Sequence, residues 1–450
     1  TRADIPTLAR GLGILAGAGA IGLAFELTAQ MARSLFWATV AALLIATSSA
    51  FAAHTPNGLE SSMFALCILF VALALLRGSP TTIAAALFAV STCRFEGALV
   101  VALAGLAVVM GGFGSPAARR FFPGALAWAP AYGAWHVWRR LFYGWWTPNS
   151  VAAKDGGSPD IRFTQGIAYV KGFFETDKLM TAALLIGAFA IVLRLARRRR
   201  AAPAADPAFV FLLLTSFVYT GFVVAIAGCW MPGWRMMAHV VPAIAVFGAV
   251  AASWIGVPRI VKAAVALGCA WFGWKQVSVV SAEESLAPAT IYWRDEVFGL
   301  GEMGAWLERT APRDVVVATM AAGALPYYAT HVRCLDVLGL TNEHIARFGN
   351  KDPKSIAGHI STDWPWVLRT RPDVWVSTAG GGFSKTPQPH ADRRFAGYAT
   401  VVFEFTKTTN PQGRYMSLML RPDRAAQLLQ AFRADPDVVV VSTNGIPGSP

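Results

Sequence analysis

The sequence is poor in charged residues and in cysteines, and each shortage argues against a class of protein. Only 14% of its 450 residues are charged and 55% are hydrophobic, whereas an ordinary soluble domain has about 25% charged residues. A wholly soluble enzyme of this length is therefore not expected. The cysteines are scattered and form no CxxC pair, so we expect neither a disulfide framework nor a cysteine-ligated metal. They are Cys67, Cys93, Cys229, Cys269 and Cys334.

Motifs for nucleotides and nucleic acids are also missing. No GxGxxG, GxxxxGK[ST], zinc-knuckle or helix-turn-helix pattern occurs, so no nucleotide site is predicted. We attribute the net charge of +13 to the orientation of a membrane protein and to its contact with anionic lipid. We therefore expect no nucleic-acid partner. The stretch Gly380–Gly382 is predicted to be a mobile loop rather than a phosphate cradle.

The apolar residues are concentrated before residue 282, and this distribution predicts two domains. Residues 1–281 are predicted to form a polytopic helical membrane domain, and residues 282–450 are predicted to form an aqueous α/β domain. A membrane-spanning helix needs about 20 apolar residues, and about ten such segments follow one another. They lie near residues 8–30, 34–53, 60–76, 80–93, 96–113, 121–139, 179–194, 208–228, 237–256 and 260–281.

The run from Thr81 to Gly112 is too short for two full spans. We therefore expect a tilted or partly re-entrant hairpin with its corner, Cys93–Glu96, near membrane depth. Polar backbone is tolerated there only where protein or a water-filled cavity surrounds it.

The arginines predict which way the chain is oriented. Arg194 and the run Arg197–Arg200 mark a short cytoplasmic loop. Counting outward from it, the 54–60 turn, the 94–96 corner, the 140–178 loop, the 229–236 turn and the C-terminal domain share the outer face. Thr1 would also lie outside, although no initiator Met, basic leader or signal peptide precedes it. We therefore expect that the chain is a fragment lacking at least one earlier span.

The C-terminal domain alternates strand-like and helix-like patterns. The first two strand candidates follow helical stretches and turn signals, which predicts parallel strands in a small α/β layer. The candidates are Val315–Ala318, Asp373–Val376, Thr400–Phe403, Tyr415–Met419 and Val438–Val441.

Glu60 is the first candidate site residue, because ionisable side chains near hydrocarbon are costly and rare. It allows two evenly matched interpretations. Asn57 and Glu60 have the spacing of a helix capping box, and Glu60 could equally serve a site on the outer face.

Arg94 and Glu96 also allow two interpretations. They could form a neutral pair that lets the hairpin turn, or a phosphate clamp with a carboxylate beside it, because guanidinium groups match phosphate geometry. Arg235 could give a second phosphate contact, while Trp230 beside it is typical of an aromatic belt.

Two further segments carry candidate substrate contacts. In residues 138–154, Pro148 presents Asn149 and Lys154, although an interfacial amphipathic helix would give the same pattern. In the C-terminal domain Asp336 ends a short strand, and His344 lies in a polar cluster at the start of the next helix. His344 has no HExxH context, so a zinc site is not predicted.

Several of these blocks together resemble a known family. The chain looks like the bacterial GT-C membrane glycosyltransferases, most closely the branch that contains the mycobacterial terminal arabinofuranosyltransferase of cell-wall arabinan. The resemblance covers nearly the whole chain and is more specific for the superfamily than for the sugar. The blocks are Asn57–Glu60, Arg94–Gly97, Arg140–Asn149, Met231–Arg235, Leu325–Tyr328 and Asp336–Leu340, in that order.

The resemblance implies an inverting transferase in the bacterial inner membrane. It implies a polyprenyl-phosphate sugar donor, a cell-envelope glycan acceptor and a periplasmic C-terminal domain that binds carbohydrate. Such proteins carry an acidic pair on their first external loop, one Asp of which is the catalytic base. This chain begins beyond that loop, so the base is expected upstream of Thr1.

On this hypothesis the candidate residues take three roles. Arg94 and Arg235 bind the donor phosphate, and Glu60 and Glu96 are catalytic or supporting carboxylates. The expected substrate contacts are His54, Asn57, Tyr143, Asn149, Lys154, Trp230, Tyr327, Asp336 and His344. No cofactor or metal ligand set is visible, although Glu60, Glu96 and an upstream acid could gather a divalent cation. The alternatives are a non-catalytic glycan-binding membrane protein and a transporter of lipid-linked sugars.

Overall fold

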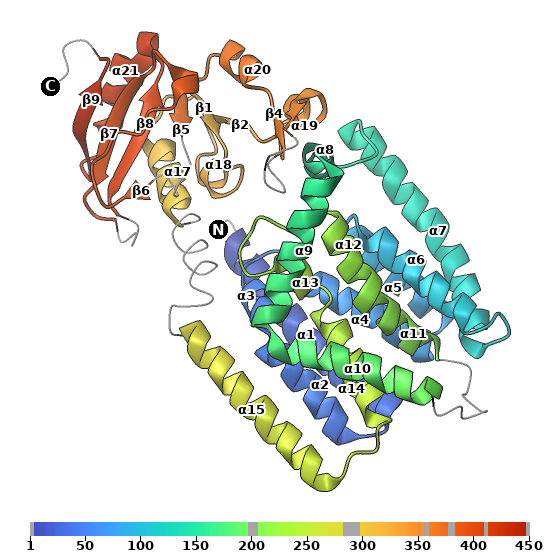
Figure 1. Ribbon diagram of the computed structural model, residues 1–450. Helices are drawn as coiled ribbons and strands as arrows, with labels where there is room; N and C mark the ends of the chain where they lie inside the picture. The colour runs from blue at the N-terminus through green and yellow to red at the C-terminus, as the bar shows by residue number, and fades with distance from the viewer. Residues whose placement is uncertain are drawn as a thin grey trace. The chain divides into compact units, whose positions relative to one another are not determined.

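A computed structural model describes residues 4–196, 206–281, 298–352, 355, 360–376, 383–408 and 413–446. The chain divides into two compact units (Figure 1). The first, here called the helical unit, comprises Thr1–Trp146 and Arg162–Ala289. The second, the sheet unit, comprises Thr290–Pro450 together with Thr147–Ile161, a short segment that the sequence analysis assigned to the membrane half. The predicted Arg197–Arg200 run and the Gly380–Gly382 loop lie outside the described residues.

Each segment predicted to be an apolar span forms helix. Among the residues that the structure describes, three helical stretches are long and apolar enough to cross a membrane, namely Ile5–Ala32, Lys178–Ala196 and Pro207–Ala225. That the remaining apolar helices also cross stays a prediction. The elements are α1 (Ile5–Ala32), α2 (Leu35–Thr47), α3 (Ser49–His54), α4 (Ser61–Arg77), α5 (Pro80–Cys93), α6 (Gly97–Met110), α7 (Pro116–Tyr143), α9 (Pro159–Thr176), α10 (Lys178–Ala196), α11 (Pro207–Leu214), η1 (Thr215–Tyr219), α12 (Thr220–Ala225), α13 (Arg235–Ala238), α14 (Val241–Ser253) and α15 (Arg259–Ser281).

Local sequence explains where these helices begin and how they pack. Ser79, Ser115 and Asp206 accept a backbone N–H from the first turn of α5, α7 and α11, and each is followed by proline. The core of the unit includes α14, which is buried from Val241 to Ala252. A helix that is apolar all round, as α14 is, has no face to offer to water.

The hairpin of α5 and α6 is short, as the sequence predicts. Each helix has 14 residues, which is about 21 Å against a hydrocarbon core of about 30 Å. A side chain at Gly97 would collide with the carbonyl oxygen of Val90, so only glycine permits this close approach. The hairpin therefore presents the Arg94–Glu96 corner at its end, with Arg94 and Glu96 both mostly buried.

The sheet unit contains a mixed sheet rather than a purely parallel layer. Strand β1 is parallel to β2 and β5, as predicted for the first two strand candidates, whereas β8 is antiparallel to β5 and β7, and β7 to β9. The order is β2-β1-β5-β8-β7-β9, with β6 paired to β8, and β3 and β4 form a separate pair. The strands are β1 (Val316–Thr319), β2 (Arg333–Asp336), β3 (Asn350–Lys351), β4 (Ser361–Thr362), β5 (Val374–Val376), β6 (Phe383–Ser384), β7 (Ala399–Phe405), β8 (Tyr415–Leu420) and β9 (Val438–Asn444).

Aromatic side chains fill both sides of this sheet. Trp306 lies fully buried against Phe403 and Phe432, and Trp375 stacks on Phe395 at 4.7 Å in a separate cluster. The helices of the unit are α8 (Asn149–Lys154), α17 (Phe298–Thr310), α18 (Ala324–Tyr328), α19 (Glu343–Phe348), α20 (Trp364–Arg369), η3 (Arg393–Phe395) and α21 (Pro422–Phe432).

Candidate functional site

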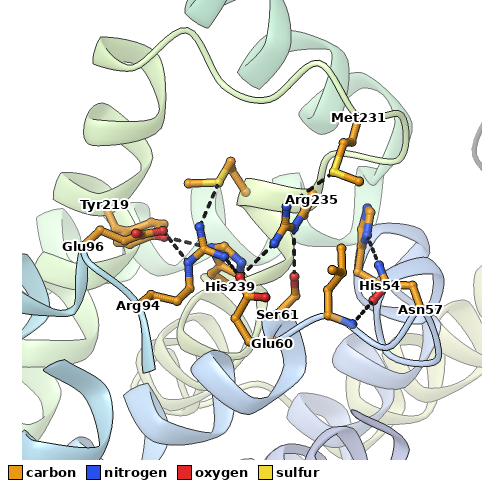
Figure 2. A network of polar contacts seen from close by, with 12 residues as sticks. His54, Asn57, Glu60, Ser61, Arg94, Glu96, Tyr219, Met231, Arg235 and His239 are labelled. Atoms are coloured by element: carbon orange, nitrogen blue, oxygen red, sulfur yellow. Dashed lines mark hydrogen bonds and ion pairs between the residues drawn. The ribbon is translucent and has the colours of Figure 1, made fainter. Parts of the chain in front are cut away.

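Four charged side chains from separate parts of the sequence meet in the helical unit (Figure 2). Glu60 immediately precedes α4, Arg94 and Glu96 form the corner between α5 and α6, and Arg235 begins α13. These four residues are called the arginine–glutamate cluster below. The sequence analysis predicted each of them as a site residue, and the structure brings all four together.

Glu60 joins the two arginines through a single oxygen. Its Oε1 accepts a hydrogen bond from Arg94 Nη1 and another, of 2.8 Å, from Arg235 Nη2. Arg94 Nε donates to Glu96 Oε1 at 2.5 Å. The neutral pair of Arg94 and Glu96 considered from the sequence is therefore present, but it is part of a larger network.

The capping-box interpretation of Glu60 is wrong. Helix α4 begins at Ser61, and Glu60 makes no side-chain cap hydrogen bond. Asn57 instead closes its own turn, because its Oδ1 accepts the Leu59 N–H at 2.9 Å. The carboxylate of Glu60 is thereby left to the arginines.

The members of the cluster differ in exposure. The side chains of Arg94, Arg235 and Glu96 are 15%, 14% and 11% exposed, whereas that of Glu60 is 37% exposed. Burial alone would raise the pKa of Glu60, but the guanidinium groups of Arg235 and Arg94 outweigh it and lower that pKa below its ordinary value. Glu60 is thus an ionised and weakly basic carboxylate, which suits ion pairing better than general-base catalysis.

Both arginines also direct N–H groups at methionine sulfur. Arg94 Nη2 lies 3.9 Å from Met236 Sδ, and Arg235 Nη1 lies 3.4 Å from Met231 Sδ. A thioether is a weak acceptor, whereas a guanidinium is a strong donor. Within the described part of the chain, the cluster therefore holds donors that an anionic oxygen would satisfy better.

Two fully buried polar residues, which the sequence analysis missed, support Glu96. The Tyr219 hydroxyl lies beside the Glu96 carboxylate and 2.9 Å from His239 Nδ1. Phe64 packs edge-on against His239. A tyrosine and a histidine within otherwise apolar segments were the available sequence signal.

His54 is a positioning residue rather than an exposed substrate contact. Only 1% of it is exposed, and it joins the 54–60 turn to the 229–236 turn. Asn57 Nδ2 donates to His54 Nδ1 at 2.8 Å, which leaves His54 Nε2 to donate to Gly233 O at 3.0 Å. Burial, followed by the positive charge of Arg235, lowers the pKa of His54 to about 4. The neutral ring therefore holds the turn that leads into Arg235.

The other predicted substrate contacts of the helical unit lie near its aromatic segments. Tyr143 is 59% exposed at the end of α7, among Trp138 and Phe142. Trp230 is partly buried in the turn that precedes α13.

The remaining predicted contacts belong to the sheet unit. Asn149 and Lys154 lie on α8, which packs against α19. Arg347 Nη2 donates to Thr147 O at 2.6 Å, and Lys351 Nζ donates to Ala152 O at 2.5 Å. The segment around α8 is thus fastened to the sheet unit through its backbone carbonyls.

Asp336 and His344 have different surroundings within that unit. Asp336 is 3% exposed, and its oxygens accept the N–H groups of Leu338 and Thr341 at 2.9 and 2.7 Å. The Asp336 carboxylate therefore holds its own turn.

His344 is more accessible than Asp336. Its Nε2 is 2.9 Å from Asp363 Oδ2, and its ring stacks on Trp366 at 4.5 Å. Tyr327, on α18, is 41% exposed. The structure therefore divides the predicted site residues between two units.

No group of three or more His, Cys, Asp or Glu side chains suited to a metal ion occurs among the residues that the structure describes. The divalent cation considered from the sequence depends on a further acid upstream of Thr1 and stays a prediction.

Comparison with protein families gives a match in the C-terminal part of the chain. A family model described as a domain of unknown function (DUF8728) matches residues 289–440, which correspond to most of the sheet unit and less than half of the chain. No curated protein matches the sequence. The match does not reach the arginine–glutamate cluster.

Proposed function

We propose that this chain is a membrane glycosyltransferase that uses a polyprenyl-phosphate sugar donor. The proposal extends to a bacterial inner-membrane location, an acceptor glycan of the cell envelope, and an outer face that carries both the cluster and the sheet unit. Arabinofuranose is the sugar favoured by the sequence resemblance.

The observation that supports this function best is the convergence of Arg94 and Arg235 at the ends of apolar helices. Both arginines have N–H groups that face only thioether sulfur among the described residues. A phosphate attached to a lipid tail offers several anionic oxygens close to hydrocarbon, so it matches both the donors and their apolar surroundings.

The chemistry assigns the arginines to the leaving group. An acceptor hydroxyl attacks the anomeric carbon, the bond from that carbon to the phosphate oxygen breaks, and the proton passes to a general base. Negative charge grows on the departing polyprenyl phosphate, and fixed cations stabilise it most where water is scarce. Glu96 orients Arg94, while the weakly basic Glu60 pairs with both arginines.

A transfer assay tests the proposal. Membranes containing the chain together with the segment expected upstream of Thr1 are incubated with synthetic farnesyl-phosphoryl arabinofuranose and an arabinan oligosaccharide, and product is detected by mass spectrometry. Arg94→Ala should abolish transfer, whereas Arg119→Ala, which changes an exposed arginine of α7, should leave it intact.

The outcomes separate the proposal from its rivals. Undiminished transfer by Arg94→Ala would remove Arg94 from the mechanism. Binding of the donor without any transfer, when the upstream segment is present, would favour a non-catalytic glycan-binding membrane protein.

A further inference from the structure

Of the two carboxylates in the cluster, Glu60 is the more exposed and is shared between two arginines, whereas Glu96 is more deeply buried. Glu96 is 11% exposed and lies between Arg94 Nε and the buried Tyr219 hydroxyl. Glu60 is 37% exposed, and a single oxygen serves both arginines. Arginine and carboxylate bind most strongly as a bidentate pair, and none of the described pairings of Glu60 or Glu96 with arginine reaches that geometry.

The local backbone does not depend on the Glu60 side chain. The turn before α4 is closed by Asn57 and anchored through His54, and Glu60 makes no cap hydrogen bond. Gly58, two residues earlier, has a φ of +75°. Glu60 can therefore change rotamer without loss of the hydrogen bonds that define the turn.

The charges of the cluster indicate what a movement of the Glu60 side chain would leave available to an anion. The two arginines and two glutamates of the cluster sum to zero, and His54 is neutral because its pKa is lowered to about 4. An anion added to this neutral set would meet the Glu60 carboxylate directly. An anion that replaced Glu60 would keep the balance, and it would also reach the N–H groups now directed at Met231 and Met236.

We propose that Glu60 is an exchangeable internal anion that pairs with both arginines and is displaced from them when a phosphate ester binds. This inference rests on the proposed function, because it takes the cluster as the phosphate site. Glu60 then competes with the ligand, and Glu96 assists it by holding Arg94 in place.

Replacement of glutamate by glutamine should therefore have opposite effects on phosphate affinity at positions 60 and 96. The purified full chain in detergent is titrated with farnesyl phosphate, and binding is followed by tryptophan fluorescence. Glu60→Gln should tighten binding on the order of tenfold, the equivalent of about one charge-assisted hydrogen bond. Glu96→Gln should weaken it, and Arg94→Gln should weaken it further.

Two control ligands identify the source of the phosphate. Farnesol carries the tail without the charge, and inorganic phosphate carries the charge without the tail. A lipid-phosphate site binds farnesyl phosphate far more tightly than either, whereas a site for free phosphate binds inorganic phosphate equally well.

The outcomes distinguish this inference from the proposed function. If Glu60→Gln weakens binding as Glu96→Gln does, Glu60 is a fixed part of the site and the exchange is refuted, although the phosphate site remains. If neither the wild-type chain nor the Arg94 variant binds farnesyl phosphate, the proposed function itself fails. Glu60→Asp provides a second variant, because its shorter side chain keeps the charge but cannot bridge both arginines. It should also tighten binding, and unchanged affinity would contradict the exchange.

Discussion

Removal of the ion pair between Arg94 and Glu96 gives the sharpest test of how the cluster contributes to stability. Arg94→Met leaves Glu96, only 11% exposed, without its cation and with the Tyr219 hydroxyl as a remaining partner. Breaking a buried pair from one side costs about 3–5 kcal/mol of unfolding free energy. Glu96→Gln is milder, about 1.5–3 kcal/mol, because Arg94 keeps Glu60 as a partner.

The double variant should cost much less than the sum of the single changes. With both charges absent no isolated buried ion remains, so we expect a coupling free energy of about 2–3 kcal/mol. The assay is equilibrium unfolding of the purified chain in mixed detergent micelles, followed by tryptophan fluorescence. Lys171 and Glu175 on α9 form a matched control, because both side chains are more than 60% exposed and should couple by less than about 0.5 kcal/mol. Additivity within about 0.5 kcal/mol at Arg94 and Glu96 would refute the reasoning.

Three other predictions follow from single positions. The pKa of His54, lowered to about 4 from an ordinary 6.5, implies a loss of roughly 3 kcal/mol of stability as pH falls from 6.5 to 4, because only the unfolded chain binds the proton in that range. The loss should be absent in His54→Gln, and equal pH dependence in both proteins would contradict the buried neutral ring. Burial raises the pKa of Cys334 to about 11, so iodoacetamide at pH 8 should alkylate it on the order of 100-fold more slowly in the native chain than in denaturant; similar rates, measured by mass spectrometry, would disprove this. Gly97→Ala should destabilise the chain by about 2–4 kcal/mol through collision with Val90, whereas Gly105→Ala in the same helix, with its nearest neighbour at 3.9 Å, should leave the unfolding midpoint nearly unchanged.

The helices were predictable from sequence because burial and membrane insertion both demand long apolar runs. The limits of α5, Pro80–Cys93, coincide with the predicted segment, since Ser79 and Pro80 mark its start and the charge of Arg94 marks its end. The break between α2 and α3 at Ser48 was not predicted. Its cause is tertiary, because the Ser48 hydroxyl donates to the buried Asp177 at 2.6 Å.

The candidate site was predictable in its charged residues and not in their partners. Glu60, Arg94, Glu96 and Arg235 stand out because charge is rare in apolar sequence. The local sequence pattern does not indicate that Asn57 caps a turn and that the Glu60 carboxylate instead pairs with the arginines. It also does not indicate that Tyr219 supports Glu96. Those relations depend on side chains from helices far apart in the sequence, which only the packed structure brings together.

The fastening of residues 147–161 to the sheet unit places a parity constraint on membrane topology. Arg347 and Lys351 bind the backbone of this segment directly, so the segment and the C-terminal domain must reside in the same aqueous compartment. Any crossings of a bilayer by the chain between them must therefore be even in number. The predicted spans at 179–194, 208–228, 237–256 and 260–281 are even in number. Loss or gain of a single crossing would place the two halves of this interface on opposite sides of the membrane.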